Sequence, residues 1–315
     1  MASGTASISG HATEASAAHY RRLSESGAGL IWVEYTYVHP SGRSEPNQMG
    51  LANEAHQESL KKVVREIKHS GAVAGIQLTH AGGKSDPQFA QGGLKSPSGV
   101  PVPNREGTFE SSRPMVMEEI ELWKSAFLQA TRRAFAIGFD AVEYHSAHGY
   151  GLNQWLSPIT NRRRDSYGGS LMNRMRLLAE IIEAARAEFP DKILAARIPG
   201  QDLFDGGLEI PEMAIVARRL EAMGLDLVDV SSGIGGWRRP PGRRGQGYLV
   251  GEAAMLQREI RIPVIGVGGI VEGTYIDKLL EEGTISLAAV GRAILENPKQ
   301  WGEQHLHANL AQQVA

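Results

Sequence analysis

Two histidines and a tyrosine stand close together where an apolar stretch of the sequence ends. The run 139–144 is largely apolar and leads directly into His145, His148 and Tyr150. Imidazole and phenol groups can donate hydrogen bonds to a carbonyl oxygen, and a phenol can also deliver a proton. In a barrel of parallel strands, chemistry takes place where the strands end. The trio therefore predicts a site that holds a carbonyl group and supplies a proton.

The spacing of the two histidines leaves three interpretations open. Within a strand, His145 and His148 would face opposite sides, so they share one cavity only if the chain turns between them. As metal ligands they would need further partners, such as Glu143 and His80, but no spacing elsewhere completes a ligand set. They can also be buried structural histidines, or a pair that donates to a developing oxyanion. We favour the oxyanion pair and predict no metal ion.

Two glycine-containing turns predict a phosphate site. They follow the strands that we expect over 263–267 and 287–290. Glycine lets backbone N–H groups approach a phosphate closely, and the helix that follows adds a favourable dipole. The loops after the last two strands of a barrel commonly form such a site, although simple turns also use glycine. The predicted residues are Gly268, Gly269, Gly291 and Arg292.

Gln77 and Arg197 lie at the ends of two other expected strands. A flavin ring needs hydrogen-bond partners on its pyrimidine edge and positive charge near N1 and O2. The residues themselves leave two interpretations equally open. Either the side chains hold such a ring, or they pair with a neighbouring carboxylate such as Glu143 or Asp229.

Short apolar runs alternate with longer amphipathic runs along the whole chain. This alternation predicts parallel strands that are covered on both faces and connected by right-handed crossover helices. The expected strands cover 29–34, 72–78, 141–144, 193–198, 227–230, 263–267 and 287–290. The expected helices cover 14–26, 54–69, 117–137, 170–188, 210–223, 252–261 and 271–282, and a last one follows Ala293.

The motifs together resemble the Old Yellow Enzyme family, whose members are FMN-dependent ene-reductases. The resemblance implies an α/β fold of the TIM (β/α)₈ barrel type, with one FMN-binding domain over residues 1–315. It also implies NADPH or NADH as the reductant and a small-molecule substrate with an activated alkene, an α,β-unsaturated carbonyl compound. The segments that carry it are 42–43, 77–82, 145–150, 167–173, 205–208, 231–233 and 291–292.

The family also implies roles for individual residues. A pair at the positions of His145 and His148 polarises the carbonyl group, so that hydride from flavin N5 adds to the β-carbon. A tyrosine at the position of Tyr150 then protonates the α-carbon. Members place a glutamine and an arginine at positions matching Gln77 and Arg197 against the flavin pyrimidine. Where the backbone at Tyr35 would contact the flavin, most members have a small residue.

The chain departs from the family pattern in three places. A barrel needs eight strands, but the first element here is a helix, so we expect the chain to lack most of the first strand. The bacterial-type branch often has a cysteine near the flavin, and this chain has none. An arginine of the family is replaced by Gly83, beside Lys84. Two alternatives follow: a truncated barrel that binds FMN weakly or not at all, and a non-reductive isomerase or cyclase that uses the same pocket.

Composition narrows the choice of partners. The 315 residues are 42% hydrophobic and 22% charged, with a formal net charge of −2 and no cysteine. These values do not indicate nucleic-acid or membrane binding, and no stretch approaches the length of a bilayer span. The absence of cysteine excludes disulfides and cysteine-ligated clusters. We expect a cytoplasmic protein, and by resemblance a homo-oligomer.

Two long insertions interrupt the regular spacing. One covers 81–114, and the other covers 231–249 and carries four arginines within 238–244. Loops of this length in a compact domain usually serve as lids or binding loops. The arginines can meet an anionic group such as a phosphate or CoA, or can face water. We interpret 165–170 as a structural turn that ends in a helix cap, and 162–164 as a solvated basic patch.

Overall fold

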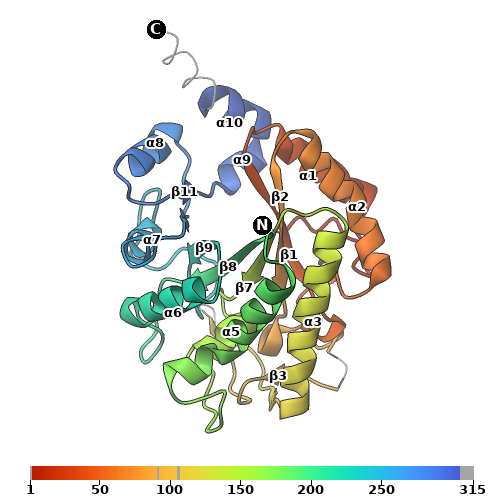
Figure 1. Cartoon of the computed structure of the whole chain (residues 1–315), viewed down its shortest axis with the longest axis vertical. Coiled ribbons are helices and arrows are strands. Elements are labelled where there is room, and N and C mark those ends of the chain that lie inside the picture. The colour runs from red at the N-terminus through yellow and green to blue at the C-terminus, as the bar shows by residue number, and fades with distance from the viewer. Residues whose placement is uncertain (1, 91, 105–106, 306–315) are drawn as a thin grey trace.

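A seven-stranded parallel sheet runs through the middle of the molecule (Figure 1). The computed structural model describes residues 2–90, 92–104 and 107–305. The strands of this sheet follow one another in chain order, and every neighbouring pair is parallel, as right-handed βα crossovers require. They are β1 (Leu30–Tyr37), β2 (Val73–Thr79), β7 (Ala141–His145), β8 (Ile193–Pro199), β9 (Leu227–Ser231), β10 (Val264–Gly266) and β11 (Leu287–Ala288).

All seven strands lie where the sequence predicts them, but three differ in length by two residues, one of them β10, which covers only three residues of the expected run 263–267. β1 continues to Tyr37 rather than ending at Glu34, because its pairing with β2 extends to the last residue of that strand. Tyr35 therefore lies inside the strand instead of following it. β11 contains only two residues of the expected run 287–290.

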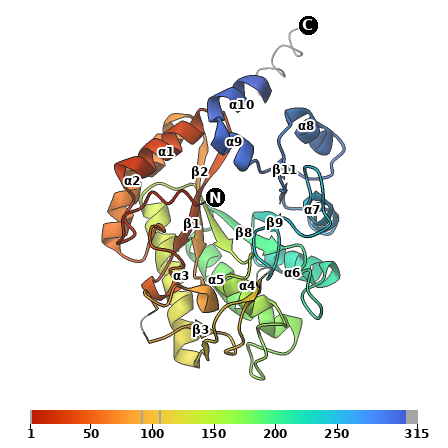
Figure 2. The same ribbon diagram turned by 180° about the vertical axis from the view of Figure 1, so that it is seen from behind.

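Helices surround the sheet (Figures 1 and 2). The predicted helices are confirmed, and α2 has the expected bounds, while the short α4 beside the histidines was not predicted. Ser170 accepts a hydrogen bond from the backbone N–H of Asn173, which confirms its predicted capping role. The helices are α1 (Glu14–Ser24), α2 (Glu54–His69), α3 (Met117–Ala136), α4 (Gly151–Leu156), α5 (Leu171–Glu188), α6 (Ile210–Ala222), α7 (Val250–Gln257), α8 (Gly273–Glu281), α9 (Arg292–Glu296) and α10 (Pro298–His305).

The sheet is open, whereas the layer of helices continues around it. In the described part of the chain no strand pairs with the outer edge of β1 or of β11, and the sheet curls into part of a barrel. Helix α10 contacts both α1 and α8 and so spans the gap on the outside (Figure 2). Arg22 of α1 donates to the carbonyl oxygens of Leu295 and Glu296 at 2.5 and 3.2 Å. These contacts join α1 to the end of α9.

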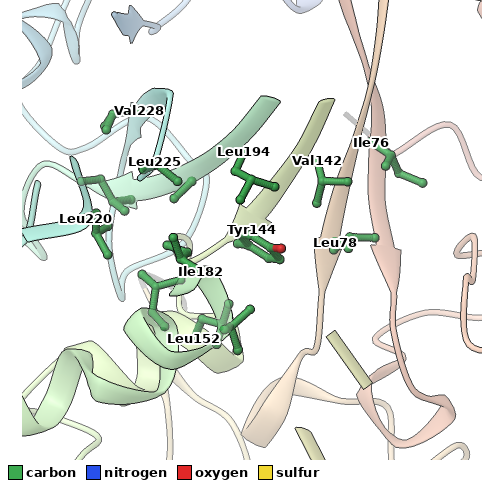
Figure 3. Packing of buried hydrophobic residues seen from close by; sticks show 14 of the residues in the cluster. Ile76, Leu78, Val142, Tyr144, Leu152, Ile182, Leu194, Leu220, Leu225 and Val228 are labelled. Carbon is green, nitrogen blue, oxygen red and sulfur yellow. The ribbon is translucent and has the colours of Figure 1, made fainter. Parts of the chain in front are cut away.

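The main core lies between the sheet and the helices. Side chains alternate along each strand, so Ile76 and Leu78 of β2 and Val142 and Tyr144 of β7 point outward into this core (Figure 3). Each apolar side chain that is fully buried in this way contributes roughly 1.5–3 kcal/mol. The intervening residues of the same strands face the barrel interior. The candidate site is therefore built from residues that alternate with the core.

The two insertions differ in structure. The segment 81–114 contains a short 3₁₀ helix (Gly82–Lys84) and four two-residue strands, whereas 231–249 has no regular element after β9. The strands of the first insertion are β3 (Lys95–Ser96), β4 (Pro103–Asn104), β5 (Gly107–Thr108) and β6 (Arg113–Pro114). Over the described ranges, none of the helices has the length and apolar character that crossing a membrane requires.

Candidate functional site

The structure brings the two histidines and the tyrosine together at the end of β7. The rings of His145 and His148 are nearly perpendicular, with centroids 4.9 Å apart, and the ring of Tyr150 lies 5.2 Å from that of His145. The chain turns between them as the spacing required, with a φ of 59° at His148 and 72° at Gly149. The three side chains therefore converge on one place although they are not on one face of a strand.

Both imidazoles are neutral at neutral pH. Burial lowers the pKa of His145 and of His148 well below the usual range, and the cations Arg197 and Lys84 lower it further. One ring nitrogen of His148 bonds to the hydroxyl of Ser231 at 2.7 Å. The Nδ1 atom of His145 is buried and has no hydrogen-bond partner among the described residues. Neutral imidazoles of this kind can donate hydrogen bonds to a ligand but do not carry a charge to it.

The phenol of Tyr150 lies between Tyr35 and Lys84. The rings of Tyr35 and Tyr150 stack with centroids 5.5 Å apart, so Tyr35 contacts the site through its side chain. Burial raises the pKa of Tyr150, which keeps the phenol protonated. The ammonium group of Lys84 lies 5.1 Å from the Tyr150 ring centroid and donates to the His148 carbonyl oxygen at 2.9 Å. Burial lowers the pKa of Lys84 to about 8.

Four polar side chains meet on the inner face of the sheet. Gln77 Nε2 donates to Glu143 Oε1 at 2.5 Å, and Arg197 Nε lies 3.3 Å from Asp229 Oδ2. The pairing of Gln77 and Arg197 with carboxylates, one of the two interpretations, is therefore confirmed. Arg197 Nε is buried and not aligned for a hydrogen bond with a described residue. Arg197 and Asp229 are level with His145 in the sheet register, and Gln77 and Glu143 lie one inward-facing row before it, so the cluster can also face a ligand at the strand ends.

The glycine turn after β10 forms a cradle between two guanidinium groups. A Cβ atom added to Gly269 would lie 3.2 Å from Nη2 of both Arg239 and Arg292. A Cβ on Gly268 would lie 2.7 Å from the backbone nitrogen of Tyr248. Backbone and guanidinium donors at a glycine turn are the donor set that an anionic phosphate prefers. Gly291 precedes Arg292 as the N-cap of α9, and the second turn contributes the guanidinium group of Arg292 to this cradle.

Arg239 was not predicted individually. It belongs to the arginine-rich loop, and its guanidinium carbon lies 4.6 Å from the Tyr248 ring centroid. The composition of the loop indicated an anionic ligand, but four arginines in one loop do not show which of them faces the cradle. That choice depends on the path of the loop over the end of β10.

Two other polar segments are structural. His80 is buried against Trp123 with ring centroids 3.8 Å apart, away from His145. Among the described residues no group of three or more histidine, aspartate or glutamate side chains is placed to hold a metal ion.

The interpretation of 162–164 as solvated is wrong for Arg163. Its guanidinium donates to the carbonyl oxygens of Pro97 and Met115 at 2.7 and 2.6 Å, because the 81–114 insertion folds over it.

Enzymes with phosphate-bearing ligands commonly combine a TIM-barrel sheet with a phosphate site after the last two strands, and this partial barrel has a glycine turn between two arginines at that place. Residues 1–311 match the NADH:flavin oxidoreductase / NADH oxidase family, and the chain belongs to it. It is 39% identical over 282 residues to the NADPH dehydrogenase of Geobacillus thermodenitrificans (strain NG80-2), covering 89% of this chain and 80% of that protein. Identity to the NADPH dehydrogenase of Bacillus subtilis (strain 168) is 34% over 282 residues, with 89% and 80% covered.

Two solved structures have a fold similar to that of this chain. A 2-naphthoyl-CoA reductase in complex with 2-naphthoyl-CoA superposes with a TM-score of 0.89 and 26% identity, covering 96% of this chain and 48% of that one. The Old Yellow Enzyme homologue from Zymomonas mobilis superposes with a TM-score of 0.82 and 22% identity, covering 99% and 86%. The chain is an FMN-dependent NAD(P)H oxidoreductase of the Old Yellow Enzyme family.

The residues present fit FMN on two observations. The cradle at Gly269 is lined by two guanidinium groups at a position that a side chain would fill. Buried polar atoms of His145 and Arg197 are left without hydrogen-bond partners among the described residues, which is costly unless a ligand supplies them. Phosphate and ring would then lie at the ends of successive strands of one sheet.

Proposed function

We propose that this protein is an ene-reductase, which reduces the activated C=C bond of α,β-unsaturated carbonyl compounds at the expense of NAD(P)H. The observation that carries the proposal is the convergence of two neutral imidazoles and a protonated phenol at the end of β7. These groups match the needs of a conjugated carbonyl compound, whose oxygen must be polarised and whose α-carbon must receive a proton.

Each residue has a definite part in this reaction. Bound FMN would supply the redox chemistry, in which a hydride from NAD(P)H would be passed on to the β-carbon of the alkene. His145 and His148 donate hydrogen bonds to the carbonyl oxygen and stabilise the negative charge that develops there. Tyr150 transfers the proton of its hydroxyl group to the α-carbon and recovers one from solvent. Tyr35 stacks against Tyr150 and limits its rotation.

The other predicted residues hold the cofactor. Gln77 offers an amide, and Arg197 a positive charge, to the pyrimidine edge of the ring. Around the phosphate we place Arg239 and the predicted residues of the two turns. These are Gly268, Gly269, Gly291 and Arg292.

The test combines a spectrum with a variant series. The purified protein should release FMN on denaturation and oxidise NADPH when a cyclic enone is added. Replacing His148 with alanine should lower kcat/KM for the enone by about 10²–10³-fold, as loss of an oxyanion donor does. Replacing Tyr150 with phenylalanine should lower it by about 10²-fold or more. His69→Ala, on the last turn of α2, serves as the control.

Two outcomes would contradict the proposal. A protein that takes up no added FMN would favour the truncated barrel. Conversion of an enone without NAD(P)H would favour an isomerase or cyclase.

A CoA thioester is a second candidate substrate, and the loop between β9 and α7 favours it. Trp237 is 66% exposed there and packs under Arg238, with 5.5 Å between the guanidinium carbon and the ring centroid. An exposed indole with neighbouring arginines suits a ligand that carries an aromatic base and phosphates. A similar structure contains 2-naphthoyl-CoA. If this candidate is right, Trp237→Ala should raise KM for an enoyl-CoA and leave KM for the free enone unchanged.

A further inference from the structure

Two acidic side chains meet inside the barrel. Glu143 of β7 and Asp229 of β9 are buried, and β8 lies between their strands. In register, Glu143 lies beside Ala195 of β8, whose small side chain leaves space on the inner face. Asp229 is in register with Arg197 of β8, the next inward-facing residue after Ala195, so the two carboxyl groups face each other diagonally past Ala195, where they interact through a side-chain hydrogen bond.

The surroundings do not supply enough donors for two ionised carboxylates. Among the described residues, no N–H or O–H group donates to Glu143 Oε2 or to Asp229 Oδ1. Ionised carboxylates only accept hydrogen bonds, so two of them in contact repel one another. One proton between them turns the contact into a hydrogen bond, as in other buried pairs of acids.

The local charges decide which acid carries the proton. Burial and the charge of Asp229 raise the pKa of Glu143. Burial also raises the pKa of Asp229. Arg197 lowers the pKa of both acids, but its Nε atom lies 3.3 Å from Asp229 Oδ2, so Asp229 is the acid that is placed to stay ionised. His145, the next residue on the same face of β7, is neutral and adds no charge.

Each acid also holds one of the side chains that the proposed function places against the flavin, and the inference rests on that function. Glu143 accepts a hydrogen bond from Gln77 at 2.5 Å, and Asp229 lies 3.3 Å from Arg197. The contact with Glu143 uses one amide N–H of Gln77 and leaves its amide oxygen and second N–H for a ligand. The protonation state of Glu143 and Asp229 therefore affects how Gln77 and Arg197 are held.

We propose that Glu143 is a positioning residue that stays protonated, shares its proton with Asp229, and leaves Arg197 with one counter-ion instead of two. Two ionised carboxylates would outweigh the single guanidinium group, whereas with the shared proton the charges cancel. Reduction adds negative charge to the flavin ring, so a second carboxylate in the barrel interior would oppose it. A neutral Glu143 therefore adds no negative charge that would oppose the reduction of bound FMN.

The test compares two amide substitutions by the reduction potential of bound FMN. Glu143→Gln puts a neutral amide where we place a neutral acid, and should change the ratio of affinities for reduced and oxidised FMN less than about 2-fold. Asp229→Asn removes the ionised partner. It should raise that ratio roughly tenfold at an effective dielectric constant of about 20, equivalent to about 30 mV for a two-electron couple. Equal shifts in both variants, or no shift in either, overturn the proposal.

Infrared spectroscopy of the wild-type protein gives a readout that does not depend on the folding of a variant. We expect the C=O stretch of a protonated, buried carboxylic acid, and a wild-type spectrum without it overturns the proposal. Glu143→Gln should remove the band, and Asp229→Asn should retain it. The two possible failures can be told apart. A wild-type protein that takes up no FMN refutes the proposed function. The infrared band does not depend on FMN, so its presence or absence still tests the shared proton.

Discussion

Replacing Gly269 with alanine tests the phosphate cradle directly. Gly269 has a φ of +67°, and an added Cβ would lie 3.0 Å from Cε1 of Tyr248 and 3.2 Å from Nη2 of both Arg239 and Arg292. Gly283, which follows α8, has a φ of +62° with nothing within 4 Å of an added Cβ. The two glycines therefore share the same backbone demand, but only one of them faces the guanidinium groups. Gly283→Ala is the matched control.

The structure separates two effects of these substitutions. A left-handed backbone costs a residue with a Cβ roughly 1–2 kcal/mol, so both variants should lose about this much stability without FMN. At Gly269 the methyl group also displaces the two arginine ends from the phosphate position. Losing one charge-assisted hydrogen bond costs about 1.5–3 kcal/mol, which weakens FMN binding roughly 10–100-fold.

The assay is a fluorescence titration of each apoprotein with FMN, together with thermal unfolding in its absence. We expect the two apoproteins to melt at similarly lowered temperatures, and only Gly269→Ala to bind FMN more weakly. If Gly269→Ala binds FMN as tightly as Gly283→Ala does, the cradle is not the phosphate site and the reasoning is refuted.

Three further predictions concern other parts of the chain. Arg239→Ala should weaken FMN binding about tenfold, whereas Arg258→Ala, on the surface at the end of α7, should leave the titration unchanged. Because burial lowers the pKa of Lys84 to about 8 while the unfolded chain keeps its ordinary value, the wild type should gain stability relative to Lys84→Met as pH rises from about 8 to 10.5. Urea unfolding at several pH values measures this difference, and a relative loss over that range would contradict it. Trp123→Ala should cost about 3–5 kcal/mol in the free energy of unfolding, against about 0.5 kcal/mol or less for the exposed Leu122→Ala, as chemical denaturation will show.

Much of the architecture could be predicted from local patterns. Strands covered on both faces need consecutive apolar residues, and such runs marked all seven strands of the sheet. Gly138 and Gly224 take a positive φ just after α3 and α6, and glycine is the usual residue at such helix ends, so these ends also follow from local sequence. The interpretation of Ser170 as a cap also depended only on its neighbours.

The candidate site could be predicted in part. His145, His148 and Tyr150 are close in sequence, so their residue types and the strand before them were enough to predict a common site. Their roles in reduction, and those of Gln77 and Arg197 at the flavin, stay predictions that the experiments above test.

Other contacts depended on the tertiary structure alone. The approach of Arg239 to Arg292 joins segments that are far apart in the sequence, as does the meeting of Glu143 with Asp229. Which side chains meet across a sheet depends on strand order, register and the direction of each loop, and residue types do not specify these. The sequence by itself determined which strands form and which chemistry their ends can offer. The tertiary structure decided which of those groups touch, because contact between distant residues is set by strand order, by register and by how the open sheet curls around its interior.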